Sequence, residues 1–348
     1  MRKYMIIVLM SYLLPGVLLA QKENKELVEA KLAFNEGVIA LENEKPKLAE
    51  SRFEGAIFMA PEFALPYLEK AKLLILDEFY EQALELAGQA VEQDAEYGEG
   101  YYIKGYLFLL ADSAAGAVQN FTRAAQKGFK PAELYYFRGL ANFREEDYSS
   151  ALIDFSLAID NRFDFALAYH ERASTKMQMG DFKGAIHDYE QTIGFMPNLA
   201  MAYDNMGTCK IRIGNFKEGI ADYTKAIELD DDFYIAWNNR GSAYYLLENF
   251  EKAQIDFEKA LDINKTYASA WNNLGLTKAR QENYIGAVQA LDKCLEIDKE
   301  FAKAYLNRGY AKEYLGNFEG ACMDWRKAKK LGIEQADDYL TECEGVEE

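Results

Sequence analysis

The 348-residue chain has few of the residues that interrupt or cross-link a fold. It contains 6 prolines and 4 cysteines, and no stretch rich in glycine, serine and proline divides it. The lack of linkers indicates one continuous body, and four cysteines are too few for a disulfide-stapled scaffold. Since 50% of the residues are hydrophobic, the chain can bury a large core.

Positive charge is also in short supply. The chain has 39 Lys and Arg against 57 Asp and Glu, a formal net charge of −18. Binding to nucleic-acid phosphates requires clustered Lys and Arg, and the sequence has no such cluster, so we expect no nucleic-acid partner. The excess of acidic residues is explained by a solvated surface, and the alternative is a basic partner.

Residues that carry catalysis are scarce as well. The only histidines are His170 and His187, and their separation places them on different predicted helices. The chain has no metal-ligand spacing, phosphate-binding loop, dinucleotide fingerprint or nucleophile elbow. The sequence therefore predicts a protein that is not an enzyme and that holds no metal and no cofactor.

The N-terminus has the order of a secretory signal. Arg2 and Lys3 precede an apolar run, and Ala20 precedes a polar segment. This order predicts a signal peptide over residues 1–20, cleaved after Ala20, and export to the periplasm or out of the cell. The alternative is an uncleaved membrane anchor, although the apolar stretch of about 17 residues is at the lower limit for a spanning helix. No other segment predicts membrane insertion of the mature chain.

Small residues recur at every 34th position, and this period dominates the sequence. The first column is Gly37, Ala71, Gly105, Gly139, Ala173, Gly207, Gly241, Gly275 and Gly309. Large aromatic residues follow sixteen positions later in most copies: Phe53, Phe121, Phe155, Tyr189, Tyr223, Phe257 and Trp325. Nine copies cover residues 30–335 without insertion or deletion: 30–63, 64–97, 98–131, 132–165, 166–199, 200–233, 234–267, 268–301 and 302–335.

Each copy contains two amphipathic stretches of about 12–14 residues with apolar residues at helical spacing. Pairs such as Gly180-Asp181 and Gly316-Asn317 lie between them, and a glycine there accepts the left-handed conformation that ends a helix. The small columns allow two antiparallel helices to approach closely. Because one helix pair cannot bury its own apolar face, neighbouring copies must stack. The predicted fold class is all-α.

The pattern resembles the tetratricopeptide repeat family. The segment from Trp271 through Gly275 and Ala287 to Asp298 follows the pattern of that family closely. The resemblance implies an α-solenoid, a right-handed superhelix of helix-turn-helix repeats. Copy one departs from the pattern at Ala33 and Pro46, which is typical of an end repeat. Residues 21–29 form a lead-in, and residues 336–348 are expected to form a C-terminal capping helix over the last apolar face.

Arginine and aspartate recur with a spacing of sixteen residues. The arginines come from the first helix of a copy and the aspartates from the second: Arg138 and Asp154, Arg172 and Asp188, Arg240 and Asp256, Arg308 and Asp324. We interpret them as partly exposed salt bridges within each repeat, worth about 0.2–1 kcal/mol each. The alternative is an exposed arginine row that binds acidic ligands. Asp222 is opposite Met206 and does not fit the pattern.

Asparagine recurs on the first helices, which line the concave face in the tetratricopeptide family. Asn205, Asn239, Asn273 and Asn307 hold one repeat position, and Asn238 and Asn272 precede two of them. The resemblance implies an asparagine ladder that binds the backbone of an extended peptide, as in the O-linked N-acetylglucosamine transferase superhelix. The alternative is that these side chains bond neighbouring helices.

Aromatic residues take the equivalent face of copies three and four. Tyr102, Tyr106 and Tyr136 are candidates for an apolar pocket that receives partner side chains. The alternative is that they pack between helices.

Two cysteines lie near the C-terminus. Cys322 is in the second helix of the last repeat and Cys343 is in the capping segment. In an oxidising compartment they are candidates for a disulfide that fixes the cap, provided that their Cα atoms lie within about 7 Å.

Taken together, these features predict an exported, non-catalytic scaffold that binds extended peptide or protein segments on the concave face. The alternative is a structural subunit of a cell-envelope or secretion assembly that docks through its convex face or its ends. The sequence identifies neither the partner nor the oligomeric state.

Overall fold

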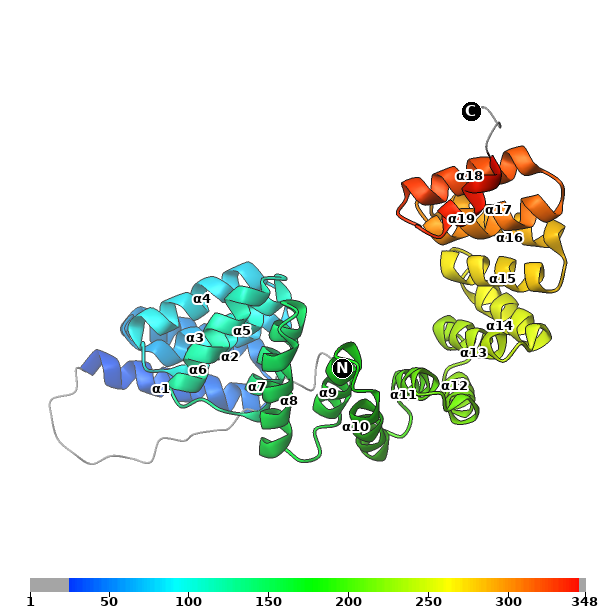
Figure 1. The fold of residues 1–348 in the computed structure, drawn as a ribbon. Coiled ribbons are helices and arrows are strands. Elements are labelled where there is room, and N and C mark those ends of the chain that lie inside the picture. The colour runs from blue at the N-terminus through cyan, green and yellow to red at the C-terminus, as the bar shows by residue number, and fades with distance from the viewer. Residues whose placement is uncertain (1–24, 344–348) are drawn as a thin grey trace. The chain divides into compact units, whose positions relative to one another are not determined.

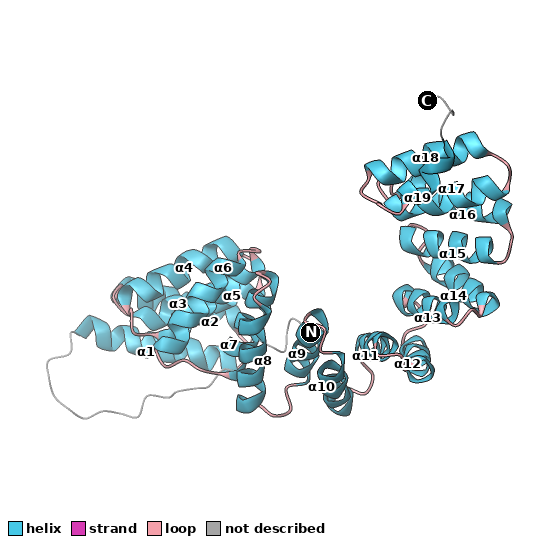
Figure 2. Ribbon diagram, viewed as in Figure 1, coloured by secondary structure: helices cyan, strands magenta, loops and turns pink. Residues whose placement is uncertain are grey.

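The computed structural model describes residues 25–343, and every regular element in that range is a helix (Figure 1, Figure 2). The all-α prediction is therefore confirmed. The predicted signal peptide lies outside the described residues. Between residues 25 and 343, no helix combines the length and the apolar character that crossing a bilayer requires.

The helices follow one another in pairs, with three residues in the loop inside each pair. Their bounds are α1 Lys25–Glu42, α2 Pro46–Met59, α3 Ala64–Leu76, α4 Tyr80–Gln93, α5 Gly98–Leu110, α6 Ala114–Gln126, α7 Ala132–Arg144, α8 Tyr148–Asn161, α9 Ala166–Gln178, α10 Phe182–Phe195, α11 Ala200–Arg212, α12 Phe216–Leu229, α13 Tyr234–Leu246, α14 Phe250–Ile263, α15 Ala268–Arg280, α16 Tyr284–Ile297, α17 Ala302–Tyr314, α18 Phe318–Lys330 and α19 Ala336–Leu340, followed by the 3₁₀ helix η1 Thr341–Cys343.

The chain divides into two compact units, one ending at Thr175 and the other beginning at Lys176. In the first unit, each odd-numbered helix packs on the even-numbered helix that follows it, from α1 on α2 to α7 on α8. In the second unit, the same pairing runs from α11 on α12 to α17 on α18, and α19 packs on α18. Each pair also contacts the next pair in its unit, as stacking requires.

The 34-residue column of small residues has a direct steric cause. A Cβ atom at Gly139 would lie 2.7 Å from the ring of Phe155, and one at Gly105 would lie 2.8 Å from the ring of Phe121. Phe121 and Phe155 are fully buried. The aromatic ring sixteen residues after the small residue therefore fills the space that a side chain would need, and the two columns form one packing unit.

The turn between the two helices has the same backbone conformation in all nine copies. The residue seven places after the small column has a positive φ in each copy, from 57° at Glu44 to 86° at Gly214. Only three of these residues are glycine, namely Gly180, Gly214 and Gly316, and the other six are acidic. The left-handed conformation that was predicted at the glycines thus also occurs in the copies that lack glycine.

The residue after this turn caps the second helix in several copies. Asp147 accepts a hydrogen bond from the backbone N–H of Ser150, and Asn249 accepts one from Lys252. Asp181, Asn283 and Asn317 make the equivalent bond. A side-chain cap satisfies a backbone donor that the helix itself cannot satisfy, so in these five copies the Asp or Asn stabilises the start of the second helix.

The C-terminal segment covers the last repeat. Cys343 forms a disulfide with Cys322, and their Cα atoms are 5.8 Å apart. The ring of Tyr339 stacks on Trp325 with the ring centroids 5.0 Å apart, and Trp325 is buried. The cap is thus joined to α18 by a covalent bond, by an aromatic contact and by the ion pair between Lys329 and Asp337. Cys209 and Cys294 are buried thiols.

Candidate functional site

The first helices of the second unit form a continuous row. α11 contacts α13, α13 contacts α15, and α15 contacts α17. We call the surface of these four helices the first-helix face. The predicted asparagine ladder was expected on these first helices.

The asparagines of this face bond one repeat to the next. Asn239 Nδ2 donates to Asp204 Oδ1 at 3.0 Å, and Asn273 Nδ2 donates to Asn238 Oδ1 at 3.0 Å. Asn307 Nδ2 donates to Asn272 Oδ1, again at 3.0 Å. Each bond joins residues 35 apart, so the donor always reaches the residue one place before its own counterpart in the preceding repeat.

The two predicted ladder positions therefore have different roles. Asn238 and Asn272 are buried and serve as acceptors between repeats, which leaves them no surface for a ligand. Asn239, Asn273 and Asn307 are partly exposed, as is Asn205 on α11. A carboxamide has two N–H donors and one acceptor oxygen, so the bond between repeats uses only part of the hydrogen-bonding capacity of each exposed side chain.

A hollow opens on the first-helix face next to Asn273. It has a volume of about 180 Å³ and is lined by Ser242, Tyr245 and Leu246 of α13, by Phe257 of α14, and by Asn273 and Leu276 of α15. Ser242 lies close enough to Asn273 for a weak hydrogen bond of 3.5 Å. The hollow thus combines an apolar floor with a carboxamide at its rim.

The tyrosines of copies three and four pack against other aromatic rings. Tyr136 is 6% exposed and packs against Phe165, with the ring centroids 4.9 Å apart. Tyr102 packs against Phe129 at 5.1 Å, and Tyr106 packs against Phe137 at 5.1 Å. Burial raises the pKa of Tyr102 and Tyr136. These contacts correspond to the alternative interpretation, in which the rings pack between helices.

The predicted arginines and aspartates bind each other across the two helices of a repeat. Arg240 binds Asp256 with two bonds of 2.8 Å, and Arg308 binds Asp324 at 2.8 and 2.6 Å. Arg138 Nη2 lies 2.5 Å from Asp154 Oδ1. In the fourth pair, Arg172 donates to Ser156 Oγ at 3.0 Å and Asp188 accepts from Lys176 Nζ at 2.7 Å. The carboxylates are buried, with Asp256 only 3% exposed, so the expectation of partly exposed pairs needs correction.

Each of these arginines also reaches the preceding repeat. Arg138 Nη1 donates to Thr122, Arg240 Nη1 donates to Thr224 at 3.0 Å, and Arg308 Nη1 bonds Asp292 at 2.6 Å. The partner always lies sixteen residues earlier in the chain, on the second helix of the preceding copy. The guanidinium therefore connects three helices, which leaves it little capacity to bind a ligand.

The copy that lacks arginine has a substitute. Asp222 is opposite Met206, and its carboxylate binds Lys210 Nζ at 2.6 Å. Lys312 reaches Asp324 in the same way at 2.8 Å, and Asn142 bonds Asp154 at 2.9 Å. The signal that identifies this second donor is a polar residue twelve places before the aspartate, which our reading of the sequence missed.

Asp204 is the one acceptor of the row between repeats that carries a carboxylate. It is 3% exposed, and its bonds from Asn239 are bonds from a neutral amide. Burial raises the pKa of Asp204 to about 6, although the bond from Asn239 opposes the shift. In the next two copies Asn238 and Asn272 hold the same position without charge.

Between residues 25 and 343, no group of three or more His, Cys, Asp and Glu side chains has the arrangement of a metal site. The described part of the site consists of amides, hydroxyls and apolar side chains on a row of helices. Models of the tetratricopeptide repeat match residues 200–233, 234–267 and 268–301. The chain is a tetratricopeptide repeat protein.

Solved structures share the fold of this tetratricopeptide repeat protein. A tetratricopeptide repeat protein from Parabacteroides merdae is 19% identical, with a TM-score of 0.59 over 70% of this chain and 98% of that one. PilW, a type IV pilus biogenesis factor, is 20% identical, with a TM-score of 0.55 over 60% and 98%. YrrB, described as having an unusual peptide-binding site, is 24% identical, with a TM-score of 0.50 over 53% and 95%.

At these identities the likeness shows the fold. No match was found among curated proteins. The three segments that match the family models are the sixth, seventh and eighth copies of the 34-residue period, and they carry α11 to α16. The hollow beside Asn273 lies within them.

Proposed function

We propose that this protein is a non-catalytic scaffold that binds an extended segment of another protein on the first-helix face. The observation that carries the proposal is the hollow of about 180 Å³ beside Asn273, set in a row of partly exposed asparagines at one position per repeat. Apolar hollows with a few placed polar groups are typical of binding sites.

The physical basis is a match between two regular structures. An extended backbone presents N–H and C=O groups at regular intervals, and Asn239, Asn273 and Asn307 each have donors and an acceptor beyond the bond between repeats. That bond also fixes the orientation of each carboxamide. A site that is already ordered loses little conformational entropy when the ligand binds. Peptide binding is also the property described for YrrB, which shares the fold.

We further propose that the protein works in an exported compartment, with residues 1–20 removed as a signal peptide. The disulfide between Cys322 and Cys343 supports this assignment, because disulfides persist in oxidising compartments and are rare in the cytosol. An uncleaved N-terminal anchor is the alternative. The N-terminal sequence of the chain purified from its own host distinguishes the two, since cleavage leaves Gln21 as the first residue.

The binding face is tested by polar substitutions at the hollow. Leu246→Ser and Leu276→Ser replace two side chains of the hollow, and Leu246 is 59% exposed. The matched control is Ile255→Ser with Ile285→Ser on the second helices of the same copies, where the side chains are 56% and 64% exposed. Peptides are first selected from a displayed random library on the unmodified protein.

We expect the substitutions at the hollow to weaken binding of the selected peptides at least tenfold and the control to change it less than twofold. Equal effects of the two double variants would refute the assignment to the first-helix face. If only the Ile255→Ser, Ile285→Ser variant disrupts a complex isolated from the exported fraction, the protein is instead a structural subunit that docks through its second helices. The exposed Ile255, Ile285 and Met323 favour that second candidate.

A further inference from the structure

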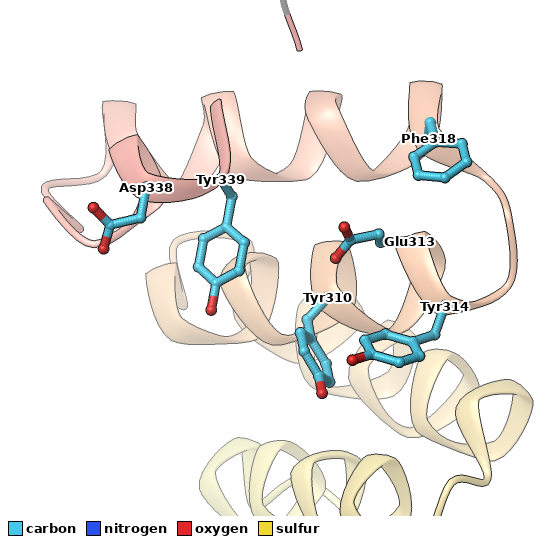
Figure 3. A pocket seen from close by; sticks show the side chains of 6 residues that line it. All are labelled: Tyr310, Glu313, Tyr314, Phe318, Asp338 and Tyr339. Carbon is cyan, nitrogen blue, oxygen red and sulfur yellow. The ribbon is translucent and has the colours of Figure 1, made fainter. Parts of the chain in front are cut away.

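A second and larger cavity lies at the C-terminal end of the second unit. It has a volume of about 580 Å³ and is lined by Tyr310, Glu313 and Tyr314 of α17, by Phe318 at the start of α18, and by Asp338 and Tyr339 of α19. Figure 3 shows the Glu313 side chain between the rings of Tyr339 and Tyr314, with Phe318 and Asp338 at opposite ends. The cavity is of the size that holds a small ligand or a large side chain.

The aromatic walls of this cavity are held in place by other rings. Tyr314 stacks on Tyr284 with a centroid distance of 4.6 Å, and Tyr310 lies 4.8 Å from Tyr314. Tyr339 stacks on the buried Trp325. A hydrogen bond with Tyr314, together with burial, raises the pKa of Tyr310 to about 12, so its ring keeps a neutral hydroxyl at physiological pH. The walls are therefore ordered and uncharged.

The charge of the cavity is of one sign. Its lining contains the carboxyl groups of Glu313 and Asp338 and no Lys, Arg or His. Two nearby cations of α17 and α18 are bonded elsewhere, since Lys312 binds Asp324 at 2.8 Å and Lys329 binds Asp337 at 2.5 Å. The electron-rich faces of tyrosine rings attract cations, so rings and carboxylates favour the same kind of ligand.

We propose that this cavity binds the guanidinium or ammonium group of a basic side chain on the partner protein. The group would contact the tyrosine faces, and the carboxylates would supply the opposite charge. The methylene groups of an arginine or lysine side chain would pack against Phe318, which is 58% exposed. The inference rests on the proposed function in one respect, namely that the cation belongs to a protein segment.

The position of the cavity connects it with the first-helix face. Tyr310, Glu313 and Tyr314 hold the same repeat positions as Ser242, Tyr245 and Leu246, which lie 68 residues earlier and line the smaller hollow. One face therefore carries an apolar hollow in the seventh copy and an acidic, aromatic cavity in the ninth. A partner segment that follows this face meets both sites.

The test compares two blocked five-residue peptides on the full mature chain by isothermal titration calorimetry. One has arginine at its centre between glycines, and the other has citrulline, which keeps the shape and loses the charge. We expect the citrulline peptide to bind at least tenfold more weakly. Equal binding of the two peptides, or no measurable binding of the arginine peptide at millimolar concentration, would overturn the proposal. The comparison needs no protein variant.

A variant pair then locates the site. Glu313→Gln with Asp338→Asn removes the charge of the cavity, and Asp337→Asn is the matched control, since Asp337 lies outside the cavity and pairs with Lys329. Circular dichroism checks that each variant is folded. We expect at least a tenfold loss of affinity for the arginine peptide in the double variant and less than a twofold change in the control. Equal losses in both variants would place the binding elsewhere.

Two further measurements separate the possible sources of failure. Tetramethylammonium that binds as tightly as the arginine peptide would show a site for small free cations and overturn the assignment to a protein segment. The Leu246→Ser, Leu276→Ser variant is expected to bind the arginine peptide unchanged. If selected peptides fail to bind the smaller hollow while the arginine peptide still binds here, the proposed function fails and the cation site stands.

Discussion

A buried carboxylate without a cationic partner is sensitive to pH, and Asp204 is such a group. Burial raises its pKa in the folded chain to about 6, above the usual value of an aspartate, so the folded chain holds the proton more tightly than the unfolded chain. Stability from this group is fully present below about pH 4 and is lost as pH rises through about 6. The loss amounts to about 3 kcal/mol.

We therefore expect Asp204→Asn to raise the stability of the protein at pH 7, by about 1–3 kcal/mol, and to leave it nearly unchanged at pH 4. The variant gives the sixth copy the residue that the next two copies already have, Asn238 and Asn272. Chemical denaturation of both proteins at pH 4, 5, 6 and 7 measures the difference between their free energies of unfolding. The contributions of the other carboxylates are the same in both proteins and cancel in this difference. The exposed Asp231→Asn is the control, and a gain independent of pH would contradict the explanation.

At the scale of single residues, the sequence identified the right side chains more often than their partners. The asparagine row, the arginine and aspartate pairs and the two terminal cysteines were all visible as columns or positions. The bond from Asn273 to Asn238 was not visible in the sequence. It depends on how one repeat is rotated against the next, and a regular spacing of residues contains no information about that rotation. The burial of Asp256 was missed for the same reason.

At the scale of the helix hairpin, the left-handed turn is imposed by packing rather than by residue preference. Six of the nine turn residues are Glu or Asp with φ near 60°, a conformation that costs a non-glycine residue about 1–2 kcal/mol. Sequence reasoning found the turn only where glycine marks it. In the other copies, the close approach of two helices around a small residue fixes the chain reversal.

Glycine at one of these turns should therefore stabilise the protein. We expect Glu146→Gly and Glu282→Gly, at φ values of 59° and 62°, each to add roughly 0.5 kcal/mol, since the relief of strain exceeds the extra entropy of glycine in the unfolded chain. Thermal unfolding measures the gain. Glu258→Gly in the middle of α14 is the control and should lose about 1 kcal/mol. A loss at all three positions would show that the turns are unstrained.

At the scale of the whole molecule, the consequence of a repeat array is that stability is local. Within each unit a pair of helices contacts only its neighbours, so a defect is felt mainly in adjacent copies. Leu291 of α16 is fully buried against Gly275, and Leu291→Ala should cost about 2–5 kcal/mol.

Hydrogen exchange with mass spectrometry resolves where that loss appears. We expect faster exchange in α15 to α18 and unchanged exchange in α3 to α8, because α16 packs on α15 and α17 and a defect in a repeat array is felt mainly in adjacent copies. Faster exchange throughout residues 64–161 would show that the array unfolds as one cooperative body. The unmodified protein in the same denaturant concentration provides the reference.

The fold at this scale was predictable because a 34-residue period that recurs in nine copies is compatible with few folds other than a stack of helix pairs. The acidic cavity was not, since it forms where α17, α18 and α19 meet and the capping segment belongs to no column. The columns describe what the copies share, and two residues of this cavity, Asp338 and Tyr339, come from α19, which is not a repeat.

The arginines that contact three helices constrain the length of the chain around them. Each guanidinium holds one partner sixteen residues before it and another sixteen residues after it. A single residue inserted before the arginine in its own helix would turn its side chain by about 100° and move both partners out of reach. In the copies that have such an arginine, an insertion or deletion therefore costs contacts to two other helices, so the guanidinium favours a fixed spacing on both sides.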